Sequence, residues 1–477
     1  MISGRTFVKT AKAAALLVAL QCGMGGAAQA ATLTQEEALA VHKRATIVDT
    51  HNDTMMKVID KNTWLPLVNI REATSFHIDI PKLEQGGLNV PFFAAYTAPY
   101  LSTDNKVDYT LTNSRILALI SALHWTVNNN SDKMGLARSV AEVESLLQAK
   151  KIAAVASIEG AYSLKADNGI ELLRQYNDLG VRAIVFTHNY SNDLGEGINN
   201  AYKDGTASQG GLTELGKTAV QEMNRLGMII DVSHLNEATF WGVVQTTNAP
   251  IIASHSGAYA LKDHVRNLKD DQIRAIAKTG GVVNIPYWKA LIAAGEKVDC
   301  SQMVDHIDYV VKVAGVDHVG LGSDFDGAPM LSDLEDCSAL PKITLELAKR
   351  GYTQSDIEKI LGGNSLRVMK DVWHRADAKN RADAPVVTPA LQMGEVIATP
   401  LPLLSAKIDA GKGATLKDAG IKVIIDGKIY KPAYNKATGV VQFQVTESLA
   451  TNYHVVTFEA ENDRGQVSRE ARTFYVQ

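Results

Sequence analysis

The chain has 477 residues, of which 46% are hydrophobic and 21% are charged, and its formal net charge at neutral pH is −4. This length predicts two or three domains with sizeable cores, and the mildly acidic balance argues against a protein that binds the phosphate backbone of nucleic acids. Three cysteines are too few for a disulfide scaffold or a thiolate zinc cluster.

The first 30 residues have the three parts of a secretory signal peptide. Basic residues occupy positions 5, 9 and 12, an apolar run covers Ala13–Leu20, and Ala28-Gln29-Ala30 is a small-x-small cleavage site. The apolar run is too short to span a membrane as a stable helix. We therefore expect an exported protein, either periplasmic or extracellular.

Two cysteines, Cys300 and Cys337, lie beyond this segment. An exported compartment permits disulfide bonds. The two residues either pair with each other or remain as separate buried thiols, and the sequence favours neither arrangement.

Residues 41–375 alternate short apolar runs with longer amphipathic stretches. Eight of the runs are rich in Val and Ile and flanked by Gly or Pro, which is typical of strands buried on both faces. Helical spacing follows, as over Thr213–Leu226, where Gly227 provides a stop. Eight strands separated by helices predict an α/β protein with a (β/α)₈ TIM barrel; a doubly wound sheet is the alternative, but no Gly-x-Gly-x-x-Gly follows the first strand. The runs are Ala45–Thr50, Leu88–Ala95, Ile152–Ile158, Val181–Thr187, Met228–Ser233, Pro250–Ser254, Gly281–Ile285 and His318–Ser323.

The composition changes after Trp373. Ala376–Ala390 is rich in Ala, Asp, Lys and Pro and is predicted to be a linker. Beyond it, alternating segments and an Asp426-Gly427 hairpin signal predict a small Ig-like β-sandwich. This tail contains one histidine, His454, and no cysteine, so we expect no chemistry there. The predicted divisions are a signal peptide at 1–30, a barrel at 31–375, a linker at 376–390 and an accessory domain at 391–477.

Side chains capable of metal chemistry stand at the ends of six of the eight predicted strands. The C-terminal ends of the strands in a TIM barrel form one rim, and the active site lies there. A single histidine or carboxylate at a strand end is usually structural, but six in register on one rim are hard to explain that way. We therefore expect a metal site on a rim that carries His51, Asp53, Glu159, His188, His234, His255 and Asp324.

The candidate ligands are imidazoles and carboxylates, which favour zinc and leave manganese, cobalt and iron as alternatives. Three histidines with Asp53 and Glu159 are too many for one tetrahedral catalytic metal with an open position, so they indicate two metals that share a carboxylate. Alternation along the strands turns Asn52 and Asp231 away from the site. His264, His306 and His318 have no strand-end placement and are expected to be structural.

The motifs around these residues resemble the membrane (renal-type) dipeptidase family. The resemblance covers roughly residues 40–375, and all its elements occur together and in order. It implies a (β/α)₈ barrel hydrolase with a binuclear zinc centre that cleaves dipeptides. The motifs are His51-Asn52-Asp53, Ser157-Ile158-Glu159-Gly160, Phe186-Thr187-His188, Asp231-Val232-Ser233-His234, Ser254-His255-Ser256, Val265-Arg266-Asn267 followed by Asp270-Asp271, Gly320–Gly327 and Gly362–Arg367.

The resemblance also implies a ligand set for two zinc ions. His51 and Asp53 would hold one ion and His234 and His255 the other. Glu159 would bridge them.

Further roles follow from the same resemblance. His188 would steady the developing oxyanion, Arg266 would bind the free carboxylate of the substrate, and Asp324 would be the acid/base residue. The sequence Asn284–Tyr287 departs from the family pattern, which leaves Tyr287 as a weak candidate for the family's aromatic substrate contact. The β-sandwich tail also lies outside the pattern.

The resulting hypothesis is an exported metallodipeptidase with two zinc ions, in which a metal-bridging hydroxide attacks dipeptides that have a free C-terminal carboxylate. An amidase or deacylase acting on N-acyl amino acids or lactam rings is the alternative, and a non-catalytic binding protein is a third hypothesis. The expected partner is a small dipeptide, with no nucleic acid and no stable membrane span. The sequence leaves open a homodimer, the role of the tail and the stereochemical preference.

Overall fold

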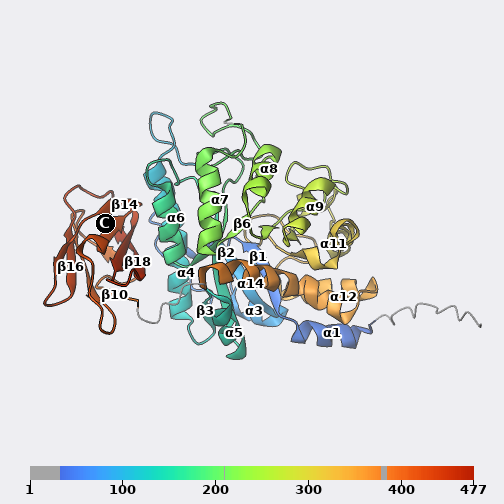
Figure 1. Ribbon diagram of the computed structural model, residues 1–477. Helices are drawn as coiled ribbons and strands as arrows, with labels where there is room; N and C mark the ends of the chain where they lie inside the picture. The colour runs from blue at the N-terminus through green and yellow to red at the C-terminus, as the bar shows by residue number, and fades with distance from the viewer. Residues whose placement is uncertain (1–32, 209, 378–383) are drawn as a thin grey trace, which may run out of the picture. The chain divides into compact units, whose positions relative to one another are not determined.

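The computed structural model describes residues 33–208, 210–377 and 384–477. The predicted signal peptide therefore lies outside the described residues. Eight parallel strands form the central sheet, and Figure 1 shows helices packed around them. The predicted TIM barrel is confirmed, and a ninth short strand, β3 (Met134–Leu136), pairs with β4. In hydrogen-bonded order the barrel strands are β1 (Ile47–Asn52), β2 (Leu88–Tyr96), β4 (Ile152–Glu159), β5 (Val181–Val185), β6 (Ile229–Asp231), β7 (Ile251–Ala253), β8 (Val282–Ile285) and β9 (Val319–Leu321).

The barrel closes between β9 and β1 through residues just beyond the regular strands. Asn52 and Phe325 form a parallel bridge. The backbone N–H of Asp53 donates to the carbonyl of Phe325 at 2.8 Å, and that of Asp324 donates to the carbonyl of His51 at 3.1 Å. Two of the predicted metal ligands and the predicted acid/base residue thus take part in closing the barrel.

Helices follow the strands where the sequence supplies caps. The helix predicted over Thr213–Leu226 is α7 (Glu214–Leu226): Thr213 caps it by accepting from the N–H of Gly216, and Gly227 ends it with a φ of 69°. The other principal helices are α1 (Gln35–Arg44), α3 (Ile80–Gly86), α4 (Tyr109–Asn129), α5 (Val140–Gln148), α6 (Gly169–Asp178), α8 (Glu237–Thr246), α9 (Asp270–Lys278), α11 (Cys300–Ala314), α12 (Pro341–Lys349) and α14 (Asn364–Asp377).

Helix α14 covers the N-terminal ends of barrel strands. Its Asn364 donates to the carbonyl of Val319, the first residue of β9, and its Trp373 is buried in a core shared with Val48 of β1 and Val155 of β4. The C-terminal strand ends are left for the loops that carry the candidate ligands.

The tail contains two β-sheets that share one hydrophobic core. Leu404 and Val441 of the four-stranded sheet pack with Val423 and Phe458 of the five-stranded sheet, so the two form a sandwich. The predicted Asp426-Gly427 hairpin is present, with φ values of 47° and 79°. The sheets consist of β10 (Val386–Pro389), β12 (Leu403–Asp409), β16 (Val440–Gln444) and β15 (Ala433–Asn435), and of β11 (Glu395–Ile397), β18 (Val467–Val476), β17 (Tyr453–Glu461), β13 (Lys422–Ile425) and β14 (Lys428–Tyr430).

The segment expected to be a linker contains the end of α14, at Asp377, and the strand β10. Residues 378–383 of that segment lie outside the described residues. After it, the five-stranded sheet packs on barrel helix α6. The buried amide of Gln175 donates to the carbonyl of Ile424 at 3.1 Å and accepts from the N–H of Gly427 at 2.7 Å.

An ion-pair network strengthens this contact. Arg469 of β18 bonds Asp178 and Glu171 of α6 and Glu459 of β17, each at 2.6–2.7 Å. Its side chain is only 16% exposed, so these charges are weakly screened by solvent. The sandwich is therefore joined to the barrel by well-matched polar groups.

Cys300 and Cys337 are both free and buried, so the structure has separate buried thiols and not the disulfide that the sequence left open.

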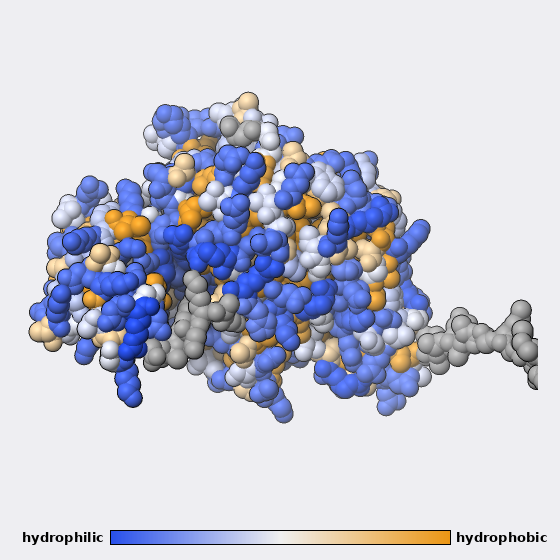
Figure 2. Space-filling model, viewed as in Figure 1, coloured by the Kyte–Doolittle hydropathy of each residue, from blue (hydrophilic) through white to orange (hydrophobic). Residues whose placement is uncertain are grey.

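The face in Figure 2 is mostly hydrophilic, with separate apolar patches. None of the helices within the described ranges combines the length and the apolar character needed to cross a membrane.

His454 in the tail makes folding stability sensitive to pH. Its Nδ1 lies 2.6 Å from Asp426 Oδ2 and its Nε2 lies 3.0 Å from the carbonyl of Ala450, so both ring nitrogens face acceptors. Burial alone would lower the pKa of His454, but the Asp426 carboxylate and the Ala450 carbonyl outweigh it and raise the pKa above its ordinary 6.5. This stabilisation is fully present below pH 6.5 and is lost as the pH rises through the folded-state pKa.

We therefore expect the free energy of unfolding of the wild type, relative to His454→Gln, to fall as the pH rises above 6.5. Urea unfolding of both proteins at several pH values measures this difference. A wild-type advantage that is constant or grows with pH would contradict a protonated His454.

Candidate metal centre

Seven of the predicted site residues lie at the C-terminal ends of the barrel strands. His51 is within β1 and Glu159 is the last residue of β4, so strand pairing fixes their backbones. The others follow the ends of β1, β5, β6, β7 and β9 by one to three residues. His188 is partly buried and the rest are buried; the five residues beyond the strands are Asp53, His188, His234, His255 and Asp324.

The carboxylate of Glu159 lies among three imidazoles. Its Oε2 is 3.5 Å from His51 Nε2, while its Oε1 is 2.9 Å from His234 Nε2 and 3.5 Å from His255 Nε2. Each oxygen therefore faces a different set of nitrogens. A carboxylate arranged in this way can bridge two cations.

Two nitrogen and oxygen atoms of this cluster lack the hydrogen bonds that buried polar groups normally make. His51 Nε2 and Asp53 Oδ1 are buried without a hydrogen-bond partner. The Nε2 atoms of His234 and His255 face each other at 2.9 Å. The other ring nitrogen of His234 lies 3.3 Å from the amide oxygen of Asn189, which orients the ring toward the cluster.

These atoms fit a metal ion. Three groups of imidazole nitrogens and carboxylate oxygens each lie within 4.8 Å of one another. Imidazoles and carboxylates that converge on one buried site are the usual ligands of zinc and related ions. The groups are His51, Glu159 and His255; Glu159, His188 and His234; and His51, Asp53 and Asp324.

The protonation states of the cluster are set by burial and by the charges within it. Burial lowers the pKa values of His234 and His255 well below 6.5, which keeps both rings neutral. Burial would raise the pKa of Glu159, but the neighbouring histidines, His51 foremost, hold it well below its ordinary value. Burial would lower the pKa of His51, but Glu159 and Asp53 raise it well above 6.5. A metal ion at this position would displace that proton.

Asp324 stands on a strained turn beside the cluster. Both Asp324 and His234 have a φ of 65°, a left-handed conformation that residues other than glycine rarely adopt. Burial, reinforced by Asp53 and Glu159, raises the pKa of Asp324 to about 8. A Cβ at Gly327 would lie 2.2 Å from Asp53 Oδ2 and 2.5 Å from Asp324 Oδ1, so this approach requires a glycine.

Arg266 brings a buried positive charge to the same rim. Its Nη1 donates to Ser256 Oγ at 3.3 Å and its Nη2 to the carbonyl of His255 at 3.2 Å, while its Nε has no partner. In the described part of the chain no carboxylate forms an ion pair with it. Burial lowers the pKa of Arg266 to about 10, so the guanidinium remains charged at neutral pH.

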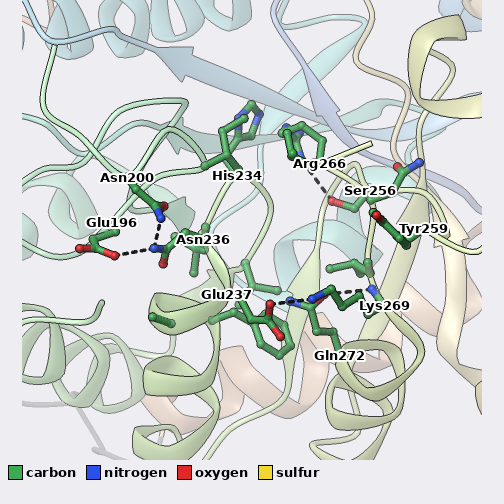
Figure 3. Close-up of a pocket in the computed structure, with 18 residues that line it drawn as sticks. Glu196, Asn200, His234, Asn236, Glu237, Ser256, Tyr259, Arg266, Lys269 and Gln272 are labelled. Atoms are coloured by element: carbon green, nitrogen blue, oxygen red, sulfur yellow. Dashed lines mark hydrogen bonds and ion pairs between the residues drawn. The ribbon is translucent and has the colours of Figure 1, made fainter. Parts of the chain in front are cut away.

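A cavity of about 530 Å³ opens beside this arginine. Figure 3 shows Arg266 and His234 close together along its lining, with Ser256 beside the guanidinium and with Glu237 and Lys269 lower in the cavity. A buried cation that pairs with no carboxylate of the described residues, beside a cavity that also reaches His234, is suited to bind an anionic group of a small molecule.

Some residues considered in the sequence lie elsewhere. Tyr287 is 0% exposed, and its ring packs against Phe325 at 5.4 Å, so the structure does not bring it to the cavity. Asp231 accepts from the N–H groups of Ser233 and Ser254, and Asn52 donates to the carbonyl of Phe92, as expected for structural residues.

Sequence reasoning missed Tyr162, which holds the loop of His188. Its hydroxyl accepts from the N–H groups of His188 at 2.9 Å and Tyr190 at 3.1 Å and donates to the carbonyl of Tyr190 at 2.8 Å. The one available signal was its position three residues after Glu159. This position gives no indication that the Tyr162 hydroxyl bonds the loop of His188, which lies 26 residues further along the chain.

A buried cluster of imidazoles and carboxylates on the C-terminal rim of a TIM barrel, with an unpaired arginine beside a cavity, defines a metal-dependent hydrolase. Residues 35–383 match the membrane dipeptidase family, peptidase family M19. The chain belongs to this family and is a dipeptidase.

Individual relatives agree. The chain is 33% identical over 349 residues to an uncharacterized dipeptidase of Schizosaccharomyces pombe, covering 71% of this chain and 83% of the relative. The crystal structure of the probable dipeptidase PvdM from Pseudomonas aeruginosa has a TM-score of 0.64 at 26% identity, covering 72% of this chain and 99% of that one. A metallopeptidase from Rhodobacter sphaeroides, liganded with a phosphinate mimic of the dipeptide L-Ala-D-Ala, has a TM-score of 0.62 at 26% identity, covering 69% and 99%.

Removing the hydroxyl of Tyr162 tests its role. In Tyr162→Phe the N–H groups of His188 and Tyr190 lose their buried acceptor, so we expect the free energy of unfolding to fall by about 1–3 kcal/mol. Dipeptide hydrolysis should fall as well, because the loop that carries His188 is loosened. Chemical unfolding and initial rates measure the two effects, and wild-type values for both would show that the hydroxyl does not hold this loop.

Proposed function

We propose that this protein is an exported dipeptidase that holds two zinc ions and cleaves dipeptides with a free C-terminal carboxylate. His51 and Asp53 would hold one ion, His234 and His255 the other, and Glu159 would bridge them. The observation that carries the proposal is the placement of the two Glu159 oxygens, one toward His51 and one toward His234 and His255.

Zinc is favoured by the chemistry of the donors, which are imidazoles and carboxylates without a thiolate. Zinc ions bound there would polarise the peptide carbonyl and lower the pKa of a water molecule so that it becomes a nucleophile near neutral pH. The chain supplies the remaining groups that orient the substrate and move protons.

His188 is suited to donate a hydrogen bond to the carbonyl oxygen of the scissile peptide. Its ring lies 4.3 Å from the ring of His234, and burial lowers its pKa, so it is a neutral imidazole with one N–H. Such donors are most effective where negative charge develops on the oxygen.

Asp324 is suited to transfer protons. The carboxylates of Asp324 and Asp53 both lie against Gly327, which has no side chain to separate them. The pKa of Asp324, about 8, lies near neutrality. A carboxyl group with such a pKa exchanges protons readily: its ionised form can accept a proton from water, and its protonated form can give the proton to the departing amine.

Arg266 accounts for the selection of a free carboxylate. Its buried guanidinium can form two parallel hydrogen bonds with a carboxylate, a geometry that lysine cannot reproduce. The dipeptide mimic bound by the Rhodobacter sphaeroides relative supports a dipeptide as the substrate of this chain. The signal-like first 30 residues support export.

The charge-preserving variant Arg266→Lys tests this specificity. We expect kcat/KM for Ala-Ala to fall by about 10- to 100-fold, because hydrogen bonds to charged groups contribute ~1.5–3 kcal/mol. The loss should appear mainly in KM, and hydrolysis of the C-terminal amide of Ala-Ala should be slow in both proteins. Arg274→Lys, a change at an exposed arginine of α9, is the matched control.

Steady-state kinetics with the free acid and the amide separate the outcomes. If Arg266→Lys retained the full preference for the free acid, Arg266 would not bind the carboxylate. If neither dipeptides nor their amides were cleaved by the zinc-loaded wild type, the proposed function itself would be wrong.

A further inference from the structure

A second arginine, Arg115 of α4, carries a charge that nothing in the described ranges neutralises directly. It is partly buried, and neither an ion pair nor a hydrogen bond within those ranges involves its guanidinium. Its Cζ lies 5.3 Å from the centre of the Trp64 ring, in a cation–π contact. A partly buried guanidinium without a carboxylate partner in the described ranges is available to bind an anionic group of a ligand.

The environment of Arg115 connects it to the metal centre. Tyr96, the last residue of β2, pairs in register with Glu159 of β4, so the two side chains lie on the same face of the sheet. The Tyr96 ring contacts the ring of His188 edge-on at 4.8 Å. Burial lowers the pKa of Arg115, while Tyr100, Tyr96 and Asp53 act to raise it.

The two unpaired arginines approach the barrel mouth from opposite sides. The strand order is β1-β2-β4-β5-β6-β7-β8-β9, in which β2 is second and β7 is sixth. Arg266 belongs to the segment after β7 and Arg115 to the helix after β2. In a closed barrel of eight strands these positions are diametrically opposed.

This arrangement assigns the two ends of a dipeptide. With its C-terminal carboxylate on Arg266 and its peptide bond at the candidate metal ligands, a dipeptide that crosses the mouth would place its N-terminal residue on the β2 side, since each residue spans about 3.3–3.6 Å. Tyr96 at the end of β2 and Arg115 of α4 belong to that side of the barrel, and Trp64 contacts Arg115. Trp64 adopts a φ of 60°, a costly conformation for a bulky residue, and in it the ring lies against the guanidinium.

We propose that Arg115 is a specificity-determining residue that binds the side-chain carboxylate of an acidic N-terminal residue, so that the enzyme prefers dipeptides beginning with glutamate or aspartate. This inference rests on the proposed dipeptide hydrolysis. In this arrangement Arg266 binds the C-terminal carboxylate of the second residue, and Arg115 forms a cationic subsite for the side chain of the first residue.

Paired substrates that differ by one charge test the subsite. We expect the zinc-loaded wild type to cleave Glu-Ala with a kcat/KM about 10-fold or more above that for Gln-Ala, and Lys-Ala to be the poorest substrate. In Arg115→Met the Glu-Ala to Gln-Ala ratio should fall to about 1, while Gln-Ala itself changes by less than about 3-fold. In Arg115→Lys, which keeps the charge, part of the preference should remain.

Two controls separate a lost subsite from a damaged protein. Arg71→Met removes an exposed arginine that pairs with Asp132 and should keep the wild-type ratio. The Gln-Ala rate of each variant reports the intact catalytic centre within the same protein.

The outcomes are distinct. A wild type that cleaves Gln-Ala as well as Glu-Ala, or an Arg115→Met variant that keeps the wild-type ratio, would overturn the role of Arg115 and leave dipeptide hydrolysis standing. A wild type that cleaves none of the four peptides Glu-Ala, Gln-Ala, Lys-Ala and Ala-Ala would instead overturn the proposed function, and this inference with it.

Discussion

The burial of the Glu159 carboxylate among imidazole nitrogens is the interaction on which the rest of the site depends. A carboxylate that is 3% exposed costs several kcal/mol unless opposite charges and hydrogen bonds compensate it. The compensating groups come from His51 in β1, His234 after β6 and His255 after β7. Because these residues are far apart in the sequence, the carboxylate is stabilised only once the barrel has formed.

The residues that close the barrel also carry side chains of the candidate metal cluster. The backbone bonds that join β9 to β1 are made by Asp53 and Asp324, whose side chains reach the cluster on either side of Gly327. The left-handed conformations of His234 and Asp324 are held by this surrounding structure. Substrate selection would then lie outside the cluster, in Arg266 and Arg115 on opposite sides of the mouth.

The sequence could predict those features that follow from strand periodicity. All eight barrel strands follow from short apolar runs, and the convergence of the histidines and carboxylates follows from the six runs that have such a residue at the C-terminal end, because parallel strands share one rim. Features that depend on loop and helix packing could not be predicted. Tyr162 acts through a loop 26 residues away, Arg115 of α4 packs on the ring of Trp64, and Tyr287 stands after a strand yet points into the core against Phe325.

The central claim is that Glu159 joins two metal ions on this rim. The most direct measurement is the zinc content per chain, by elemental analysis after zinc loading and dialysis, of the wild type and of folded Glu159→Gln. The account predicts about two zinc ions in the wild type and no more than one in the variant, because the amide cannot replace a bridging carboxylate. Two ions retained in Glu159→Gln, or fewer than one in the wild type, would contradict it.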